Sequence, residues 1–447
     1  MRLIHTADLH IGVESYGRPD PATGLSSRLT DFLAAFDALV EEALAQQVDA
    51  VLFCGDAYKS REPSPTHQRE FAKRIARLAR GGVAVFLLAG NHDMPNALGR
   101  ATAIEIFDTL GTEKVTVAQR PDVYRIQTRS GPLQVAALPW PRRGDLLTNE
   151  ELRGLSPDDI RTKLENFMAD KVEDLAARLT PETPTVLAAH VAVSGAEIGS
   201  EGRMVVGQDP MLLRGYLQNS AFDYVALGHY HKHQKLAGHP NGLPWVVYSG
   251  SLQPVDFGEE GEKKGYCLLT VEPGGAPGQR LTDWAFHPVP TRPFLTLRLT
   301  IDEGDLDPTG TVCRTLESQR PNWEGAIVKV VVTLPQTLMP HFNEQAVRRV
   351  LGPSDDGAPG AAWHIVSRQA PDDQAVRARL GGQPVESWTT MQALDRYLEL
   401  NNTDQARRER LLALARQLTA EGAEPTEGEE ILRLRSGQAS PLRLTGV

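Results

Sequence analysis

The residues that could carry out chemistry lie in short clusters directly after apolar runs. The most concentrated cluster is Gly90-Asn91-His92-Asp93, which follows the apolar run Val83–Leu88. An amide, an imidazole and a carboxylate are unfavourable groups with which to end a buried strand, because each loses hydration on burial. The same groups are common ligands of divalent metal ions. This stretch is therefore the first candidate for a metal site.

Four further clusters follow other apolar runs: Asp8-Leu9-His10, Gly55-Asp56, His190 and Gly228-His229-Tyr230-His231. If these runs are strands of an α/β sheet, the clusters share its carboxyl edge, where open α/β folds bind ligands. Taken alone, His190 is more often a hydrogen-bonded core residue than a ligand. Five clusters at equivalent positions are not expected by chance, and together they predict a metal site. The other seven histidines are interpreted as ordinary polar residues: His5, His67, His233, His239, His287, His341 and His364.

The mixture of side chains in these clusters restricts the metal. Carboxylates, imidazoles and one amide, without a thiolate, suit Mn, Fe or Zn. The ligands are too many for one ion, and an aspartate between two histidine-containing sets can bridge two cations about 3.5–4 Å apart. A two-metal site of this kind polarises a phosphoryl group and activates a water molecule. The predicted chemistry is therefore phosphoester hydrolysis.

Length and charge limit the class of protein. The chain has 447 residues, more than one hydrophobic core usually holds, so two or three domains are expected. The 47 basic and 57 acidic residues give a formal net charge of −10. This balance argues against a protein that binds nucleic acid through an overall basic surface, although a local basic groove remains compatible with it.

The expected compartment is the cytoplasm. The cysteines Cys54, Cys267 and Cys313 form no CxxC pair, which argues against a disulfide framework or a zinc knuckle. The N-terminus lacks the pattern of a signal peptide. No apolar run reaches the roughly 18 residues that a membrane span needs, so no membrane partner is expected.

The elements that must position the clusters alternate between strands and helices up to about residue 290. Short apolar runs that are typical of strands buried on both faces occur at Arg2–Thr6, Val48–Cys54, Val83–Leu88, Leu133–Leu138, Thr185–Ala189, Phe222–Leu227 and Trp245–Tyr248. Helical periodicity is found at Ser26–Gln47 and Pro65–Arg80. A polar, helix-prone insert follows at 141–183. This alternation predicts a layered α/β domain over residues 1–290.

The rest of the chain predicts a small second module and a helical segment. After the proline-rich stretch Pro288–Pro293, strand and helix patterns indicate an α+β module over 291–375. Two short amphipathic helices are expected within 385–420. Helices this short more often dock on a partner than fold alone. Residues 421–447 are expected to form a flexible tail.

The order of the clusters resembles a known family. The sequence DxH, GD, GNHD, a lone His and GHxH, from Asp8 to His231, is similar to that of the calcineurin-like metallophosphoesterases. The stretches Ile4–Gly12 and Tyr248–Gln253 resemble more specifically the SbcD nuclease chains of bacterial SbcCD complexes, counterparts of the archaeal and eukaryotic double-strand-break repair nuclease. The resemblance implies a fold of two packed sheets flanked by helices, with a capping domain and C-terminal helices.

The resemblance also implies a role for each site residue. One Mn ion would be held by Asp8, His10, Asp56 and His231, and a second by Asp56, Asn91, His190 and His229. His92 would protonate the leaving oxygen, with Asp93 orienting its imidazole. Many relatives carry a histidine in the run Gly-Asp-x-Phe-His, where this chain has Lys59. Lys59 is interpreted either as a phosphate contact or as a solvated loop charge.

The implied function is a Mn-dependent DNA exonuclease and endonuclease acting in double-strand-break repair and recombination. Its implied partners are DNA and a coiled-coil ATPase subunit bound through residues 385–420, within a heterotetramer that contains a homodimer of this chain. Two alternatives remain at this point. One is a phosphodiesterase or phosphatase of small substrates, and the other is an inert scaffold that tethers DNA ends.

Overall fold

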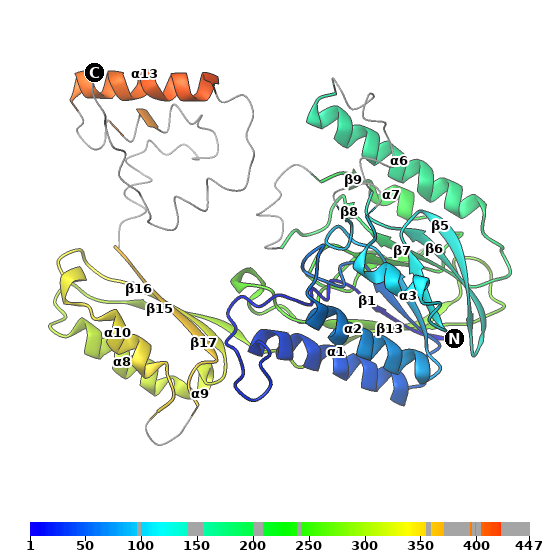
Figure 1. Cartoon of the computed structure of the whole chain (residues 1–447), viewed down its shortest axis with the longest axis horizontal. Coiled ribbons are helices and arrows are strands. Elements are labelled where there is room, and N and C mark those ends of the chain that lie inside the picture. Colours follow the sequence, from blue (N-terminus) through cyan, green and yellow to red (C-terminus); the bar gives the residue numbers. More distant parts are fainter. Residues whose placement is uncertain are drawn as a thin grey trace. The chain divides into compact units, whose positions relative to one another are not determined.

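The computed structural model describes residues 1–95, 100–141, 155–199, 209–238, 243–354, 359–370, 394–395, 398 and 404–421. The chain divides into two compact units, Met1–Gln369 and Ala370–Val447. The first unit contains all the strands described below (Figure 1). None of the described helices combines the length and the apolar character that crossing a membrane requires.

Two six-stranded sheets form most of the first unit. The first has the order β14-β13-β1-β2-β3-β4, built from Leu281–Pro288, Gly265–Val271, Arg2–Thr6, Ala50–Cys54, Ala84–Leu88 and Val115–Ala118. The second has the order β11-β12-β10-β7-β6-β5, built from Gln234–Ala237, Trp245–Tyr248, Tyr224–Gly228, Thr185–His190, Gly131–Leu138 and Asp122–Thr128. The central strands β1, β2 and β3 are parallel, as are β6, β7, β10 and β12. A separate two-stranded pair joins β8 (Ala192–Val193) to β9 (Met211–Leu212).

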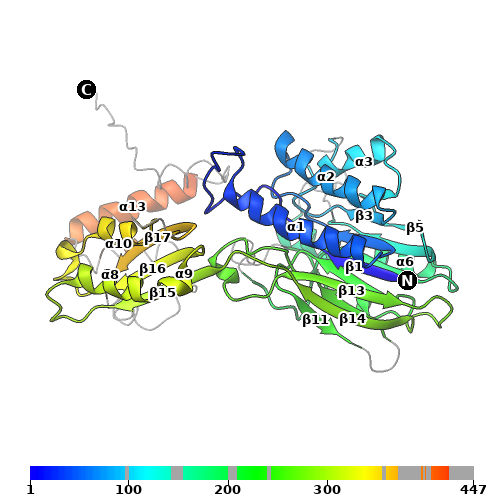
Figure 2. The ribbon, with the colours of Figure 1, turned by 90° about the horizontal axis from the view of Figure 1, so that it is seen from below.

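The sheets pack face to face, with helices on their outer faces. Leu52 and Phe86 of the first sheet share a core with Val135 and Ala188 of the second. Helices α1 (Ser27–Ala45) and α2 (Pro65–Arg80) cover the outer face of the first sheet, and Figure 2 shows α1 lying along it. Helices α6 (Pro157–Ala177) and α7 (Arg214–Leu217) cover the second sheet. The predicted layered fold of two packed sheets flanked by helices is confirmed.

The helix boundaries follow local sequence. The hydroxyl of Ser64 accepts a hydrogen bond from the backbone of His67, and Pro65 occupies the first turn of α2, both of which favour a helix start. Helix α6 begins with a capping box between Ser156 and Asp159. Because α6 lies within 141–183, the predicted helix-prone insert contains a real helix, although 142–154 lie outside the described residues.

Several strands were not predicted. The antiparallel hairpin of β13 and β14 extends the first sheet beside β1, and β4, β5 and β11 lie at sheet edges. Edge strands are buried on one face only, so their composition is less apolar than that of the central strands. A search for fully apolar runs therefore finds the central strands and misses β4, β5, β11 and β14 at the edges of the sheets.

A third sheet lies C-terminal to β14. Strands β15 (Phe294–Thr300), β16 (Ile327–Thr333) and β17 (Trp363–Gln369) are parallel and in the order β15-β16-β17. Helices α8 (Pro308–Ser318) and α10 (Glu344–Val350) pack on this sheet and share a separate hydrophobic core with it. That core includes Val330 of β16, and also Trp323 of the short helix α9 (Arg320–Trp323). We call residues 294–369 the capping module. Short helical turns also occur at η1 (Ala103–Glu105), α3 (Ile106–Thr109), η3 (Phe257–Glu259) and η4 (Met339–His341).

Of the second unit, the structure describes mainly α13 (Gln405–Glu421). Arg408 in this helix forms an ion pair of 2.7 Å with Asp395. The helix expected around Met391–Leu398 lies mostly outside the described residues. The expected flexible tail after Glu421 lies entirely outside them.

Candidate metal centre

The predicted ligands come together at the carboxyl ends of strands from both sheets. In the first sheet, Asp8 and His10 follow β1, Asp56 follows β2, and Asn91 and His92 follow β3. In the second, His190 ends β7, and His229 and His231 follow β10. The prediction of one shared sheet edge was wrong in this respect. Two sheets packed face to face point their parallel strands to one end of the sandwich, so the site is assembled across both.

The backbone at this site is strained. Seven non-glycine residues of the described chain have positive φ, and four of them are predicted ligands: Asp8 at 53°, His10 at 45°, Asp56 at 55° and His229 at 108°. Each such residue costs on the order of 1–3 kcal/mol and persists where the surroundings enforce it, most often at functional sites. Strained backbone at four predicted ligands is a second sign of a functional centre, beside the chemistry of their side chains.

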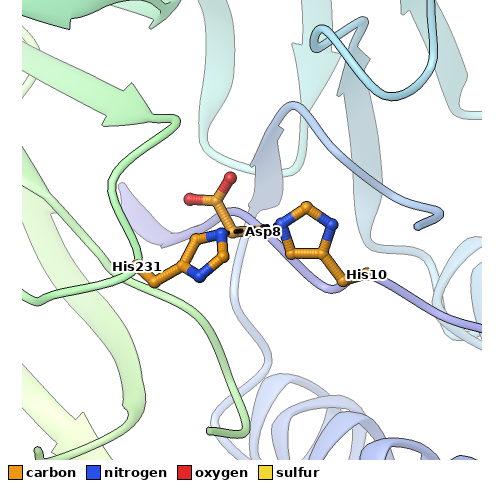
Figure 3. A group of neighbouring side chains, drawn as sticks. All are labelled: Asp8, His10 and His231. Atoms are coloured by element: carbon orange, nitrogen blue, oxygen red, sulfur yellow. Dashed lines mark hydrogen bonds between the residues drawn. The ribbon is translucent and has the colours of Figure 1, made fainter. Parts of the chain in front are cut away.

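One set of donors contains Asp8, His10 and His231. The Nε2 atoms of the two imidazoles lie 2.8 Å apart, and Figure 3 shows the rings turned toward each other beside the Asp8 carboxylate. One donor atom from each of the three residues lies within 4.8 Å of the others. Burial, followed by the nearby His231, holds the pKa of His10 well below its usual value, so its ring stays neutral. A neutral imidazole is the form that binds a metal.

A second set contains Asn91, His190 and His229. The side-chain oxygen of Asn91 lies 2.9 Å from His190 Nε2 and 3.3 Å from His229 Nδ1. His190 Nδ1 donates to the carbonyl of Cys54 at 2.8 Å, because that oxygen can only accept. The Nε2 lone pair therefore faces Asn91, and burial lowers the pKa of His190 to about 4, which keeps the ring neutral. A cation between the two acceptors would satisfy both, so this set also fits a metal.

Asp56 lies between the two sets. Its Oδ1 is 3.6 Å from His190 Nε2, and its Oδ2 is 3.7 Å from His10 Nε2. Each oxygen thus faces a different donor set, which is the arrangement of a bridging carboxylate. Gly90 makes room for it, since a Cβ there would lie 2.2 Å from Asp56 Oδ1. The glycine of Gly90-Asn91-His92-Asp93 is therefore required by close packing at the site.

His92 lies beside the first set, because one donor atom each from His10, Asp56 and His92 also lie within 4.8 Å of one another. Its Nε2 is 4.0 Å from Asp56 Oδ2, and its backbone NH donates to Asp56 Oδ1 at 2.9 Å. Its Nδ1 donates to the carbonyl oxygen of Lys59 at 2.9 Å. The ring is therefore held from behind with Nε2 directed to the site. Burial lowers the pKa of His92, the charge of Asp56 opposes this shift, and the ammonium of Lys59 adds to it.

Asp93 does not make the contact expected of it. We expected its carboxylate to orient the His92 ring, but it accepts the backbone NH groups of Gly90, Ala57 and Tyr58 at 3.0, 3.3 and 3.4 Å. Burial and the neighbouring Asp56 raise the pKa of Asp93 to about 7. Asp93 thus fixes the backbone around Asp56. The backbone carbonyl of Lys59 orients the His92 ring, which was the role predicted for Asp93. The sequence gives no sign that a backbone carbonyl would orient this ring.

Two carboxylates near the site were missed from the sequence. Glu259 Oε1 lies 2.7 Å from His231 Nδ1, and Asp209 Oδ2 lies 3.3 Å from His229 Nε2. Burial raises the pKa of Glu259, but the hydrogen bond and charge from His231 and the charge of Lys264 outweigh it and lower the pKa to about 2. Both residues occur in polar stretches that are typical of surface loops. The sequence therefore gives no sign that they contact ligand histidines.

Comparisons with known proteins support the same assignment. A model of the calcineurin-like phosphoesterase family matches residues 1–233. The chain is 30% identical over 294 residues to the SbcD chain of the SbcCD nuclease of Rhodobacter capsulatus, a match that covers 62% of this chain and 68% of that protein. It is 27% identical over 283 residues to the SbcD chain of the Bacillus subtilis SbcCD nuclease, covering 61% and 67%. The resemblance predicted from the order of the motifs is confirmed.

The likeness to solved structures is weaker. A dimetal phosphatase from Danio rerio matches 65% of this chain and 99% of its own length, at 11% identity and a TM-score of 0.36. A likeness at this level carries no argument about function. The matched segments of the SbcCD relatives span about two thirds of those proteins, so what they act on and assemble with is not transferred directly.

Proposed function

The chain belongs to the calcineurin-like phosphoesterase family and is a metal-dependent phosphodiesterase, and we propose that it is a DNA nuclease that uses two Mn ions. The observation that carries this proposal is the position of Asp56, with one oxygen toward His190 and the other toward His10. A carboxylate so placed can hold two cations at once. The similarity to the SbcD chains of SbcCD nucleases supports DNA as the substrate.

The proposed ligand sets use the residues described above. One ion would be held by Asp8, His10, Asp56 and His231, and the other by Asp56, Asn91, His190 and His229. When bound, the two ions would supply a polarised phosphoryl group and an activated water. Among these ligands, burial lowers the pKa of His10 and of His190, so these two imidazoles need not lose a proton to bind a metal at neutral pH.

His92 is proposed to deliver the proton to the leaving oxygen. The Lys59 carbonyl fixes one hydrogen on Nδ1, so Nε2 is the atom that takes up a proton from solvent and then releases it to the leaving oxygen. The His92 side chain is 33% exposed to solvent, which allows a substrate to reach it. The side chain of Lys59 is proposed as a weak phosphate contact through its charge.

The remaining parts are proposed to serve substrate and partner binding. We assign residues 1–290 to the nuclease domain, 291–375 to a capping domain that shapes the DNA groove, and 385–420 to docking of a coiled-coil ATPase subunit. The tail is assigned to 421–447. Two copies of the chain would join in a heterotetramer with the ATPase, in the cytoplasm and on the nucleoid when DNA is bound. Helix α13 supports the docking assignment through Leu411, which is exposed.

A direct assay tests the catalytic part. The purified chain is incubated with end-labelled duplex and single-stranded DNA and with a nitrophenyl phosphodiester, in Mn or Mg. We expect Mn-dependent cleavage of DNA and of the small ester. Cleavage of the small ester alone, with and without the ATPase, would favour a phosphodiesterase of small substrates. Binding of DNA without any cleavage would favour the tethering scaffold.

A truncation tests the docking part. A chain ending at residue 385 should lose association with the ATPase, measured by co-purification, because α13 is removed. Hydrolysis of the small ester in Mn should remain near the full-length rate, because every proposed ligand lies before residue 232. Tight binding of the ATPase by the truncated chain would show that docking lies elsewhere.

A further inference from the structure

A short turn connects the candidate metal centre to the capping module. The turn η3 (Phe257–Glu259) and the next residue, Glu260, present neighbouring carboxylates to two different partners. Glu259 is turned into the nuclease sandwich and is 1% exposed, whereas Glu260 contacts the capping strand β15. Neither residue was among the predicted site residues.

Glu259 holds the ring of His231. Its Oε1 accepts from His231 Nδ1 at 2.7 Å, which leaves Nε2 of that ring directed toward His10 and the site. A carboxylate behind a ligand histidine fixes the tautomer, orients the ring and makes its free nitrogen a stronger donor to a metal. Because Glu259 is buried and accepts from Nδ1 at 2.7 Å, its contact also selects a single ring orientation.

Lys264 completes this support. Its ammonium lies 2.7 Å from Glu259 Oε2 and donates to the backbone carbonyl of His231 at 3.0 Å. Both charged side chains are essentially inaccessible to solvent. A buried ion pair is costly to desolvate and is seldom retained for stability alone. Lys264 thus holds the backbone of His231 by a hydrogen bond, and Glu259 holds the ring of the same residue.

Glu260 ties the same turn to the capping module. Its two oxygens accept from the backbone NH and the hydroxyl of Thr296, at 2.8 and 2.6 Å. The ring of Phe257 meets that of Phe294 edge-on, with centroids 5.0 Å apart. A shift of β15 would therefore displace the turn η3. The last residue of this turn, Glu259, is hydrogen-bonded to the candidate ligand His231.

We propose that Glu259 is a positioning residue for the metal bound by His231, and that Glu260 makes this positioning depend on the capping module. The inference rests on the proposed function, since it concerns the same metal centre. In consequence, contacts that move the capping module change the affinity of one metal. The coupling runs in both directions, so binding of that metal also strengthens the contact between the turn and β15.

The positioning role of Glu259 is tested by isothermal titration calorimetry, in which MnCl₂ is added to the metal-free full-length chain. Glu259→Ala should weaken one of two binding events by about 10- to 100-fold, the usual effect of losing such a partner. Glu259→Gln keeps an oxygen for the Nδ1 hydrogen and should restore part of the lost affinity. Glu262→Ala is the matched control, because Glu262 also pairs with Lys264, at 2.8 Å, but is not hydrogen-bonded to His231 in the described chain.

The outcomes separate positioning from general support. Selective weakening of one event, with partial rescue by glutamine and little change in the control, supports the proposal. Wild-type affinity in Glu259→Ala overturns it. Equal weakening of both events in Glu259→Ala and Glu262→Ala also overturns it, because that pattern follows from a loosened fold.

Glu260→Ala tests the dependence on the capping module. We expect about a fivefold loss of affinity in the same binding event, at the lower end of ordinary couplings between sites. Unchanged Mn affinity in this variant overturns the coupling. Metal binding is measured without DNA and tests the positioning and the coupling. The proposed nuclease function is tested separately, by DNA cleavage.

Discussion

Strand β1 contains His5, and His10 lies just beyond its end. The two rings differ in whether the protein satisfies their hydrogen bonds. His5 is fully buried, with Nε2 donating to the carbonyl of Leu227 at 3.1 Å and Nδ1 at 3.1 Å from the hydroxyl of Tyr224. His10 is equally buried, but its Nδ1 has no hydrogen-bond partner among the described residues, and its Nε2 faces another imidazole. The body of the sandwich thus satisfies both ring nitrogens of His5, whereas at the carboxyl end the ring of His10 faces the candidate metal site.

The backbone shows the same difference. His10 has a φ of 45°, while His5 lies in regular strand geometry paired with Leu52 and Cys267. Strain and unsatisfied groups each lower stability, and natural proteins retain them where function requires them. The comparison therefore predicts that substitutions at the carboxyl end remove activity and can raise stability, whereas those in the body lower stability.

Asp56→Asn should have the largest effect. Loss of the charge of the bridging carboxylate should lower the affinity for both metals. It should reduce the cleavage rate by about 10⁴-fold or more, equivalent to roughly 5 kcal/mol of activation free energy. The metal-free variant should nevertheless unfold at a higher temperature at pH 8. Asp56 helps to raise the pKa of Asp93, so removing its charge relieves a repulsion between two buried carboxylates. Asparagine also tolerates the positive φ at this position.

Calorimetry with MnCl₂ and thermal unfolding check this prediction together. Glu303→Gln, an exposed acid of the capping module, serves as a control for charge alone. If Asp56→Asn were destabilised like an ordinary core variant, the contrast between the body of the sandwich and its carboxyl end would not hold.

His92→Gln should have the next largest effect. Cleavage is expected to fall by about 10²- to 10⁴-fold, the usual contribution of a general acid. Both metals should stay bound, because the backbone NH of His92, not its ring, bonds to Asp56 at 2.9 Å. Single-turnover cleavage and Mn titration measure the two quantities. His67→Gln is the control histidine, since its ring pairs with Glu14 at 3.1 Å and should be dispensable. Loss of both metals in His92→Gln would make it a ligand instead.

His5 should control the acid stability of the metal-free chain. Burial lowers the pKa of His5 to about 3, against 6.5 for an exposed histidine. Between these values the unfolded chain binds a proton that the folded chain does not, so stability falls as the pH falls from 6.5 toward 3. The slope from this residue is about 1.4 kcal/mol for each pH unit.

His5→Gln should flatten that part of the profile while lowering stability at pH 7 by a few kcal/mol, through the loss of the bond to Tyr224. Urea unfolding at several pH values measures both changes. His341→Gln, whose ring is not buried, should leave the slope unchanged. An unaltered slope in His5→Gln would mean that other groups cause the acid sensitivity.

The sequence predicted most of the fold, and which polar side chains lie together at the carboxyl ends of the strands, for a physical reason. Central strands such as β2 and β3 are apolar throughout, and the polar residues after them stand out against that background. Edge strands such as β14 lack this contrast. Glu259 and the Lys59 carbonyl could not be predicted either, because each acts through a contact across the fold that leaves no trace in local residue order. Asp93 was assigned to the wrong partner because its neighbour in sequence is not its neighbour in space.

Lys59→Ala should have the smallest effect, and it separates the two parts of that residue. The carbonyl of Lys59 holds the His92 ring, and its backbone NH donates to the carbonyl of Ile11 at 3.1 Å. Both contacts survive any ordinary substitution. Only the charge is lost, so we expect kcat to stay within about twofold. KM for DNA should rise about two- to fivefold at low salt, as for one exposed ionic contact, and the difference should shrink as salt is added. Steady-state kinetics at two ionic strengths measures this. A fall in kcat of about a hundredfold would assign the ammonium itself to the chemistry.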